Sequence, residues 1–371
     1  MKAIAVTPGK KQLGLLEFPE PPLRTPTDVK LRMLEIGVCG TDKEICAFEY
    51  GTPPAGEASL VLGHESLGRV VEVGAKVTAV KPGDLVVMVV RRPCGQPQCG
   101  PCAQGRQDFC ETGAFKERGI NGLHGFMTEK VVDDEKYMNP VPEALRPIAV
   151  LAEPLTIAEK GLEQMWQIQS RLPWDCAHAG AQGRGHCHRA VVLGAGPVGL
   201  LGAMLLRSQG FETFVYSKES GDSPKAKLAA QIGATFLSGA SVSLDTLAGQ
   251  VGNVDLVYEA TGASRLSYEM MKYLGTNGVF IFTGVPGRKA PIEVDTDLLM
   301  RDQVLKNQVV FGTVNAGKAD YGKAIQDLAL FDKLWPGAPA SLITGRFAPE
   351  KFADLLLGDP GGIKNLVAFG D

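Results

Sequence analysis

Three residues of types that bind zinc stand in three separate stretches: Cys39 in EIGVCGTDKEIC, His64 in VLGHESLGRVVEVG and Glu153 in VLAEPLTIAEKG. A thiolate, an imidazole and a carboxylate leave one position of a tetrahedral zinc ion open for water or a substrate oxygen. The residue types therefore predict a catalytic zinc site. Plainer explanations stay open, because Cys39 could fill the core, His64 could be a satisfied buried histidine and Glu153 could be a solvated charge at a helix start.

A second group of cysteines follows the spacing C-x4-C-x2-C-x7-C. It consists of Cys94, Cys99, Cys102 and Cys110. Four thiolates close together form a closed tetrahedral site, which is typical of structural zinc. The alternative is a loop with free thiols. Because the chain has eight cysteines and no apparent secretion signal, we expect a reducing compartment and thiols or metal ligands rather than disulfides.

A third group lies in the glycine-rich stretch WDCAHAGAQGRGHCHR, residues 174–189. It comprises Cys176, His178, His186, Cys187 and His188. Such a tract is only compositional support for a metal site. We interpret this stretch as a junction between domains whose cysteines and histidines occur together by chance.

The stretch VVLGAGPVG contains the spacing G-x-G-x-x-G at Gly194, Gly196 and Gly199. It follows an apolar strand pattern and opens a helical pattern, which is the context of a dinucleotide-binding turn. The first glycine permits a tight turn, the second lets a pyrophosphate approach the backbone, and the third lets the helix pack closely. A glycine-rich turn in an α/β domain without a ligand is the alternative.

The end of the next strand predicts the choice of dinucleotide. An acidic residue there would hold the ribose 2′-hydroxyl of NAD, but this strand ends in Ser217, and Lys218 follows. A hydroxyl and a cation suit the 2′-phosphate of NADP. Because of Ser217 and Lys218 we predict that NADP is the preferred cofactor. Glu219 is close enough to oppose that preference, so use of NAD as well stays open.

Two patterns of secondary structure must position these residues. Short β-rich runs fill the first half, at residues 1–7, 28–38, 66–74 and 83–90. From residue 189, strands and helices alternate, which predicts βαβ units and a parallel sheet. The alternation stops near residue 316, so we expect the tail to return to the first domain.

The chain of 371 residues suggests two domains. Its net charge of -3 gives no reason to expect nucleic acid as a partner. No apolar run reaches the ~20 residues of a membrane helix, and none follows a basic start as in a signal peptide. We therefore expect a cytoplasmic protein without a membrane partner.

The motifs CGTD, GHE, KPGD and GAGPVG occur in the order found in zinc-dependent medium-chain dehydrogenases. The stretches RRPC, GRQDFCETG, ERGI, HGFM and TVNAGK more narrowly resemble the glucose dehydrogenases of that superfamily. The resemblance implies an α/β fold with a GroES-like β-rich catalytic domain and a Rossmann domain. The expected boundaries are 1–188, with 316–371 returning to it, and 189–315.

The resemblance also implies roles for individual residues. Cys39, His64 and Glu153 would bind catalytic zinc, with Glu65 beside it. Thr41 would bond to the substrate oxygen or relay its proton, and Glu117 and Asn315 would contact sugar hydroxyls, as would Glu153 in the substrate pocket. The four-cysteine group would hold a second zinc, although its first gap is longer than the C-x2-C of the superfamily. The expected cofactor-binding residues are Gly194, Gly196, Pro197, Val198, Gly199, Ser217, Lys218, Thr261 and Asn315.

The implied reaction is oxidation of C1 of an aldose to the lactone, by a homodimer or homotetramer. Two positions depart from relatives, because Val90 stands where a polar residue is expected and Leu305 where some relatives have histidine. Galactose, xylose and other aldoses therefore stay open beside glucose. A zinc polyol or alcohol dehydrogenase and a catalytically silent nucleotide-binding sensor are the alternatives.

Overall fold

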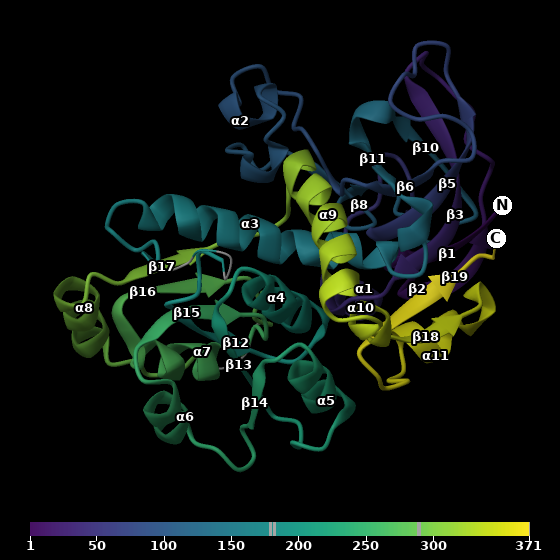
Figure 1. The fold of residues 1–371 in the computed structure, drawn as a ribbon. Coiled ribbons are helices and arrows are strands. Elements are labelled where there is room, and N and C mark those ends of the chain that lie inside the picture. The colour runs from purple at the N-terminus through teal and green to yellow at the C-terminus, as the bar shows by residue number, and fades with distance from the viewer. Residues whose placement is uncertain (178–179, 181–182, 288–290, 371) are drawn as a thin grey trace. The chain divides into compact units, whose positions relative to one another are not determined.

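The computed structural model describes residues 1–177, 180, 183–287 and 291–370. It divides into two compact units, each of which is drawn as a ribbon in Figure 1. The first unit comprises Met1–Thr156, Asn315–Ala329 and Leu342–Asp371. The second comprises Ile157–Val314 and Leu330–Ser341. Among the described residues, no helix is long and apolar enough to cross a membrane.

A seven-stranded sheet organises the first unit, in the order β11-β6-β5-β3-β19-β18 with β10 also paired to β3. Its strands are β3 (Asp28–Gly37), β5 (Glu65–Val73), β6 (Leu85–Met88), β10 (Lys130–Asp134), β11 (Met138–Val141), β18 (Ile343–Phe347) and β19 (Lys364–Ala368). The C-terminal strand β19 runs antiparallel to β3. Purple and yellow ribbons consequently lie side by side in Figure 1. The chain thus completes its first sheet with its last strand.

Two small sheets and several helices complete the first unit. The sheets are formed by β1 (Lys2–Thr7), β2 (Gln12–Glu17) and β4 (Leu60–Val61), and by β7 (Arg91–Arg92), β8 (Lys116–Arg118) and β9 (Gly122–Leu123). The short helices are α1 (Gly40–Cys46), α2 (Gly100–Ala103) and α11 (Phe352–Leu356). The apolar core includes Ile4, Leu31, Met33, Val86 and Phe126, all inaccessible to solvent. This core makes a rigid base for the loops that carry the candidate ligands.

The second unit contains a six-stranded parallel sheet in the order β14-β13-β12-β15-β16-β17. Its strands are β12 (Arg189–Leu193), β13 (Glu212–Ser217), β14 (Thr235–Ser238), β15 (Val254–Glu259), β16 (Leu274–Phe282) and β17 (Val309–Gly312). If these six strands are numbered 1 to 6 in chain order, starting at β12, their order across the sheet is 3-2-1-4-5-6, which is the Rossmann order. The order reverses between β12 and β15, and ligands bind at the carboxyl ends of strands beside such a reversal. The predicted fold class is confirmed.

The other α-helices lie between residues 152 and 341. They are α3 (Ala152–Gln169), α4 (Pro197–Ser208), α5 (Pro224–Gln231), α6 (Leu244–Val251), α7 (Ser264–Met271), α8 (Thr296–Leu305), α9 (Lys318–Leu334) and α10 (Ala338–Ser341). Most of α9 and the start of α3 belong to the first unit. The compact second unit starts at Ile157, within α3, whereas the predicted boundary stands at residue 189. A Cβ at Gly161 would touch Tyr258 and Ile281, so α3 packs on the parallel sheet well before β12 begins.

Cys176 and Cys187 form a disulfide, with their Cα atoms 5.4 Å apart. Our expectation of thiols rather than disulfides is wrong for this pair, although the other six cysteines are free. His188 stacks on Trp174 with ring centres 4.1 Å apart, and its Nε2 lies 2.6 Å from the Trp174 carbonyl oxygen. The third cysteine and histidine group thus holds the segment before β12 in place. His178 lies outside the described residues.

Candidate functional site

Cys39 is held at the start of α1 by a capping arrangement. Its sulfur accepts a hydrogen bond from the backbone N–H of Thr41 at 3.3 Å, while the Asp42 carboxylate accepts one from the N–H of Cys39 at 3.0 Å. These reciprocal bonds satisfy the helix start and fix the sulfur. The Thr41 hydroxyl has no hydrogen-bond partner within the described residues, so it is free to bond to a substrate oxygen.

His64 lies beside this sulfur, with Nε2 3.1 Å from Cys39 Sγ. The preceding Gly63 has a φ of +87°, and a Cβ there would collide with Met127 and Ile36. The other ring nitrogen, Nδ1, lies 3.6 Å from the carboxylate of Asp42. Among the described residues, neither His64 Nδ1 nor Asp42 Oδ1 has a hydrogen-bond partner, although both atoms are buried. A carboxylate behind a histidine orients the ring for a metal, and here it leaves Nε2 facing Cys39.

The charge on His64 responds to these neighbours. Burial lowers the pKa of His64, but the Cys39 thiolate and the Asp42 carboxylate raise it more, so the net direction is upward. These neighbours therefore favour the doubly protonated, charged form of the ring when no cation is bound. Because a metal binds neutral imidazole, it must replace that proton, and binding releases it.

Glu65 completes a group in which Cys39, His64 and Glu65 each place one ligand atom within 4.8 Å of the others. Its carboxylate fits only because Gly37 stands opposite it on β3, where a Cβ would come within 1.9 Å of Glu65 Oε2. Lys364 of β19 lies 2.6 Å from both carboxylate oxygens and donates to the Val38 carbonyl at 3.0 Å. Both side chains of this ion pair are almost fully buried. Glu65 is therefore clamped by Lys364.

Glu153 stands in the first turn of α3 but does not belong to the group of atoms within 4.8 Å. Its electrostatic surroundings nevertheless include His64, Glu65 and Lys364. Burial raises the pKa of Glu153 to about 7, against the lowering effect of His64. A cation bound beside this carboxyl would lower its pKa and favour the ionised form, which is the form that binds a metal. The residue types present therefore fit a catalytic zinc ion.

Glu117 and Asn315 meet in the same unit. Asn315, which has a φ of +60°, donates from Nδ2 to Glu117 Oε1 at 2.9 Å. Arg91 stands opposite Glu117 in the β7–β8 pair, and its Nε lies 3.0 Å from the same oxygen. No hydrogen bond reaches Glu117 Oε2 among the described residues. One carboxylate oxygen is saturated and the other is free to accept from a hydroxyl.

Arg91 is itself held in place on both sides. Its guanidinium lies 3.7 Å over the ring of Phe115 and donates to the Asp108 carbonyl at 3.2 Å. Val90, the predecessor of Arg91, is buried and its carbonyl accepts from Arg118 N at 3.1 Å. Leu305 lies at the end of α8 with an exposed side chain.

The four predicted cysteines converge in the segment that contains α2. One sulfur of each lies within 4.8 Å of the others, and the sulfurs of Cys99 and Cys110 are 3.9 Å apart. Zn–S bonds of about 2.3 Å in a tetrahedron separate sulfurs by about 3.8 Å. Burial raises the pKa of Cys110, but hydrogen bonds from Thr112 outweigh it and lower the value to about 6. The group fits a closed zinc site, and the longer first gap is accommodated.

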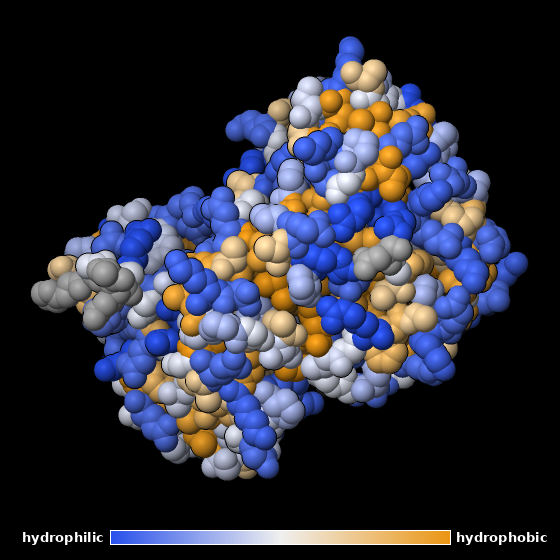
Figure 2. Space-filling model, turned by 45° about the vertical axis from the view of Figure 1, so that its right-hand side comes forward, coloured by the Kyte–Doolittle hydropathy of each residue, from blue (hydrophilic) through white to orange (hydrophobic). Residues whose placement is uncertain are grey.

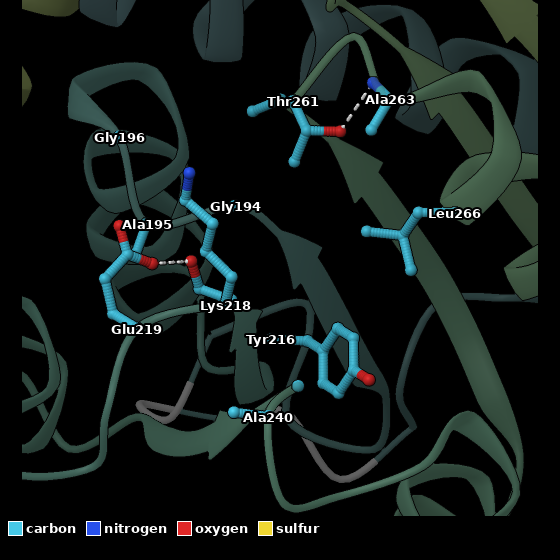
Figure 3. Close-up of a pocket in the computed structure, with 13 residues that line it drawn as sticks. Gly194, Ala195, Gly196, Tyr216, Lys218, Glu219, Ala240, Thr261, Ala263 and Leu266 are labelled. Atoms are coloured by element: carbon cyan, nitrogen blue, oxygen red, sulfur yellow. Dashed lines mark hydrogen bonds between the residues drawn. The ribbon is translucent and has the colours of Figure 1, made fainter.

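A cavity of about 610 Å³ opens at the carboxyl ends of β12, β13 and β15 (Figure 3). Gly194, Gly196, Ser217, Lys218 and Thr261 line it. Pro197, Val198 and Gly199, which begin α4, and Asn315, which lies in the first unit, do not line it.

The three glycines differ in the way the motif predicts. Gly194 has a φ of +100°, as a tight turn requires. A Cβ at Gly196 would meet nothing within 4 Å, so a ligand can approach the backbone there. A Cβ at Gly199 would lie 2.1 Å from the Gly194 carbonyl oxygen, which shows how closely α4 packs on the turn. The helix N-terminus beside Gly196 suits a pyrophosphate.

Comparison with known proteins decides the family. A profile described as glucose dehydrogenase C-terminus matches residues 146–369, and one described as alcohol dehydrogenase GroES-like domain matches residues 25–143. Glucose 1-dehydrogenase of Methanocella arvoryzae is 38% identical over 370 residues, which cover 100% of both chains. The chain belongs to the glucose dehydrogenase family.

Two further glucose dehydrogenases are similar to this chain over almost its whole length. Glucose 1-dehydrogenase of Thermoproteus tenax is 38% identical over 98% of each chain. The structure of Haloferax mediterranei glucose dehydrogenase in complex with NADP, Zn and gluconolactone matches with a TM-score of 0.87 and 31% identity, covering 100% of both chains. The resemblance seen in the sequence is confirmed, and the chain is an oxidoreductase of this family.

The sequence did not predict three residues that contact the candidate site residues. They are Asp42 beside His64, Arg91 beside Glu117 and Lys364 beside Glu65. Asp42 carried a signal, because it follows Cys39 in the motif CGTD at the third position of a helix. Arg91 lies in the quoted stretch RRPC, but nothing there indicates its contact with Glu117. Lys364 carried no signal, since it is 299 residues from Glu65.

We expect Cys110→Ser to remove one of two zinc equivalents per chain while most activity survives. The binding free energy of a structural zinc contributes to folding of its segment, so cleavage by a protease between residues 94 and 110 should accelerate. Elemental analysis and limited proteolysis would measure both effects. A variant that retains two zinc equivalents, or two disulfides among the four cysteines in the native protein, would contradict the second zinc site.

Proposed function

We propose that the protein oxidises C1 of an aldose, glucose or a closely related sugar, to the lactone and passes the hydride to NADP, with NAD as a possible substitute. The observation that carries this proposal is the meeting of Cys39 and His64 beside a buried acidic group in a chain of the glucose dehydrogenase family. The nicotinamide accepts the hydride; the protein binds and orients the sugar.

Cys39, His64 and Glu153 would hold zinc. Glu65, which lies beside Cys39 and His64, would be an additional ligand that enters the coordination shell during the reaction cycle. When bound, zinc supplies Lewis-acid chemistry that lowers the pKa of the C1 hydroxyl. Asp42 keeps the His64 ring in the orientation that presents Nε2. The Thr41 hydroxyl, which stands free next to Cys39, would accept a hydrogen bond from the C1 hydroxyl and relay its proton toward solvent by giving up its own. The oxidation then removes one proton from O1 and one hydride from C1.

The sugar would be held by Glu117 and Asn315. The free Oε2 of Glu117 accepts a hydroxyl, and the saturated Oε1 keeps the carboxylate from rotating. A buried polar group left unpaired costs about 1–3 kcal/mol. A substrate that lacks the matching hydroxyl is therefore disfavoured, which separates an aldose from a simple alcohol.

We expect Glu117→Gln to lower kcat/KM for glucose about 10- to 100-fold, which corresponds to one lost charge-assisted hydrogen bond. Activity on a simple alcohol should change little. The measurement is a panel of aldoses and alcohols with both cofactors, and exposed Glu111→Gln is the matched control. A panel in which primary alcohols are better substrates than every aldose would contradict the proposed reaction.

The proposal includes a homodimer or homotetramer in the cytoplasm. It is supported by the edge strand β17 and the preceding helix α8, on which Met300, Val304 and Leu305 are 70%, 67% and 67% exposed. Figure 2 shows one face of the molecule, on which hydrophilic residues cover much of the surface. Sedimentation of the wild type and of Val304→Asp would test this assembly.

A further inference from the structure

The carboxylate of Glu219 is held between a hydroxyl and an ammonium at the end of β13. Ser217 Oγ donates to Glu219 Oε2, and Lys225 Nζ lies 2.5 Å from Glu219 Oε1. In Figure 3 a dashed line ends on this carboxylate, which lines the cavity beside the glycine turn. Lys225 does not line the cavity itself and reaches it through Glu219.

The charges at this end of the cavity are two positive and one negative. Burial raises the pKa of Glu219, but its bonds with Lys225 and Ser217 outweigh burial and lower the pKa, so the side chain is an anion. Lys218 is exposed and makes no ion pair or hydrogen bond with any described residue. In Figure 3 its side chain points toward the turn with Gly194 and Gly196. One cation is free and the other is neutralised.

The two dinucleotides place opposite demands on this arrangement. A carboxylate accepts a hydrogen bond from the ribose 2′-hydroxyl of NAD. The same carboxylate repels a 2′-phosphate, which carries a charge of about -1.5 to -2. The groups that now bond to Glu219, a hydroxyl donor and an ammonium, are the groups that a phosphate prefers. Either Glu219 or a phosphate can use them, but not both.

We propose that Glu219 and Lys225 form an exchangeable pair that sets cofactor choice: the 2′-phosphate of NADP displaces the Glu219 carboxylate and takes over its bonds to Ser217 and Lys225, whereas NAD leaves the pair intact and bonds to Glu219. This inference deepens the proposed function, because it rests on the use of a nicotinamide dinucleotide. It assigns cofactor selection to Lys225, which sequence reasoning did not include.

The local backbone suits such an exchange. Lys225 stands in the first turn of α5, whose start is capped by Ser223 Oγ accepting from Ala226 N at 3.2 Å. The cation is thus anchored on a helix. Glu219 instead lies in the bend after β13, where its long side chain can rotate away. After displacement, Lys218 and Lys225 together match the charge of the phosphate.

Direct titration of the zinc-loaded protein with NADP and with NAD, without sugar, tests the inference by calorimetry. Lys225→Gln should weaken NADP binding about tenfold or more and change NAD binding less than about twofold, because only the phosphate loses a charge-assisted bond. Glu219→Gln should strengthen NADP binding about threefold or more and weaken NAD binding by a similar factor. Lys227→Gln, on the exposed side of α5, is the matched control and should change neither.

Each contrary result has a defined meaning. An unchanged NADP affinity in Lys225→Gln would overturn the inference, since the ion pair would then only stabilise the bend. Weaker NADP binding in Glu219→Gln would also overturn it, since the carboxylate would then support the phosphate. A protein that binds both dinucleotides as expected but oxidises no aldose would contradict the proposed function and leave this inference standing.

Discussion

Cys39→Ser should lower kcat/KM for aldose oxidation by about 10³-fold or more and remove one zinc equivalent, with the fold unchanged. A serine hydroxyl is a far weaker zinc ligand than a thiolate, and Lewis-acid activation contributes several kcal/mol to such a reaction. The remaining zinc should be the one held by the four-cysteine group. Elemental analysis, circular dichroism and steady-state kinetics would measure these three properties.

Cys46→Ser is the control for this experiment. Cys46 is a buried free cysteine at the end of α1, the helix that Cys39 caps, and burial raises the pKa of its thiol to about 12, so it is no thiolate at neutral pH. Its replacement should leave both zinc ions and most of the activity. A Cys39→Ser protein with two zinc equivalents and normal kinetics would show that Cys39 is no metal ligand.

Lys364→Met should destabilise the first unit by about 3–5 kcal/mol. The mutation removes the side-chain partner of Glu65 in the described part of the chain and leaves a carboxylate buried without its countercharge. Breaking a buried ion pair from one side has a cost of this order. Denaturant unfolding of the metal-free protein, followed by a signal from the first unit, would measure the change.

A double variant separates the charge effect from packing. Replacing both partners, as in Glu65→Met with Lys364→Met, should recover much of the lost stability, because two apolar side chains need no countercharge. Lys351→Met is the exposed control, since Lys351 lies on the surface 3.9 Å from Asp354, and should change stability by less than about 0.5 kcal/mol. A Lys364→Met protein as stable as the wild type would show that Glu65 is satisfied by other means.

The local part of the site could be predicted from sequence because it depends on neighbours along the chain. Gly194, Gly196 and Gly199 follow a strand and open a helix, and that order alone specifies a dinucleotide turn. The parallel direction of the strands in the second unit follows from the βαβ alternation, whereas their Rossmann order was implied only by the family resemblance. The meeting of Cys39 and His64 was predictable only with the family resemblance, because spacing gave no distance between them.

Other features depend on contacts that no local pattern encodes. The Glu65–Lys364 pair requires β19 to join β3, which is a choice of sheet order. The inward position of Glu219 depends on Lys225, six residues away on another element. The Cys176–Cys187 disulfide was missed because cysteine usage was interpreted through the expected compartment, which says nothing about two cysteines that the fold brings together.

The late position of β19 has a consequence for biosynthesis. A ribosome that has completed the first 340 residues has already made the candidate zinc ligands Cys39, His64 and Glu153, but not Lys364. Until β19 emerges, residues 35–37 of β3 have an open edge and Glu65 has no countercharge, which are features that favour aggregation or degradation. Chains truncated before Lys364 should therefore fail to mature even though they retain the candidate zinc ligands, so that β19 couples folding of the first sheet to the burial of Glu65.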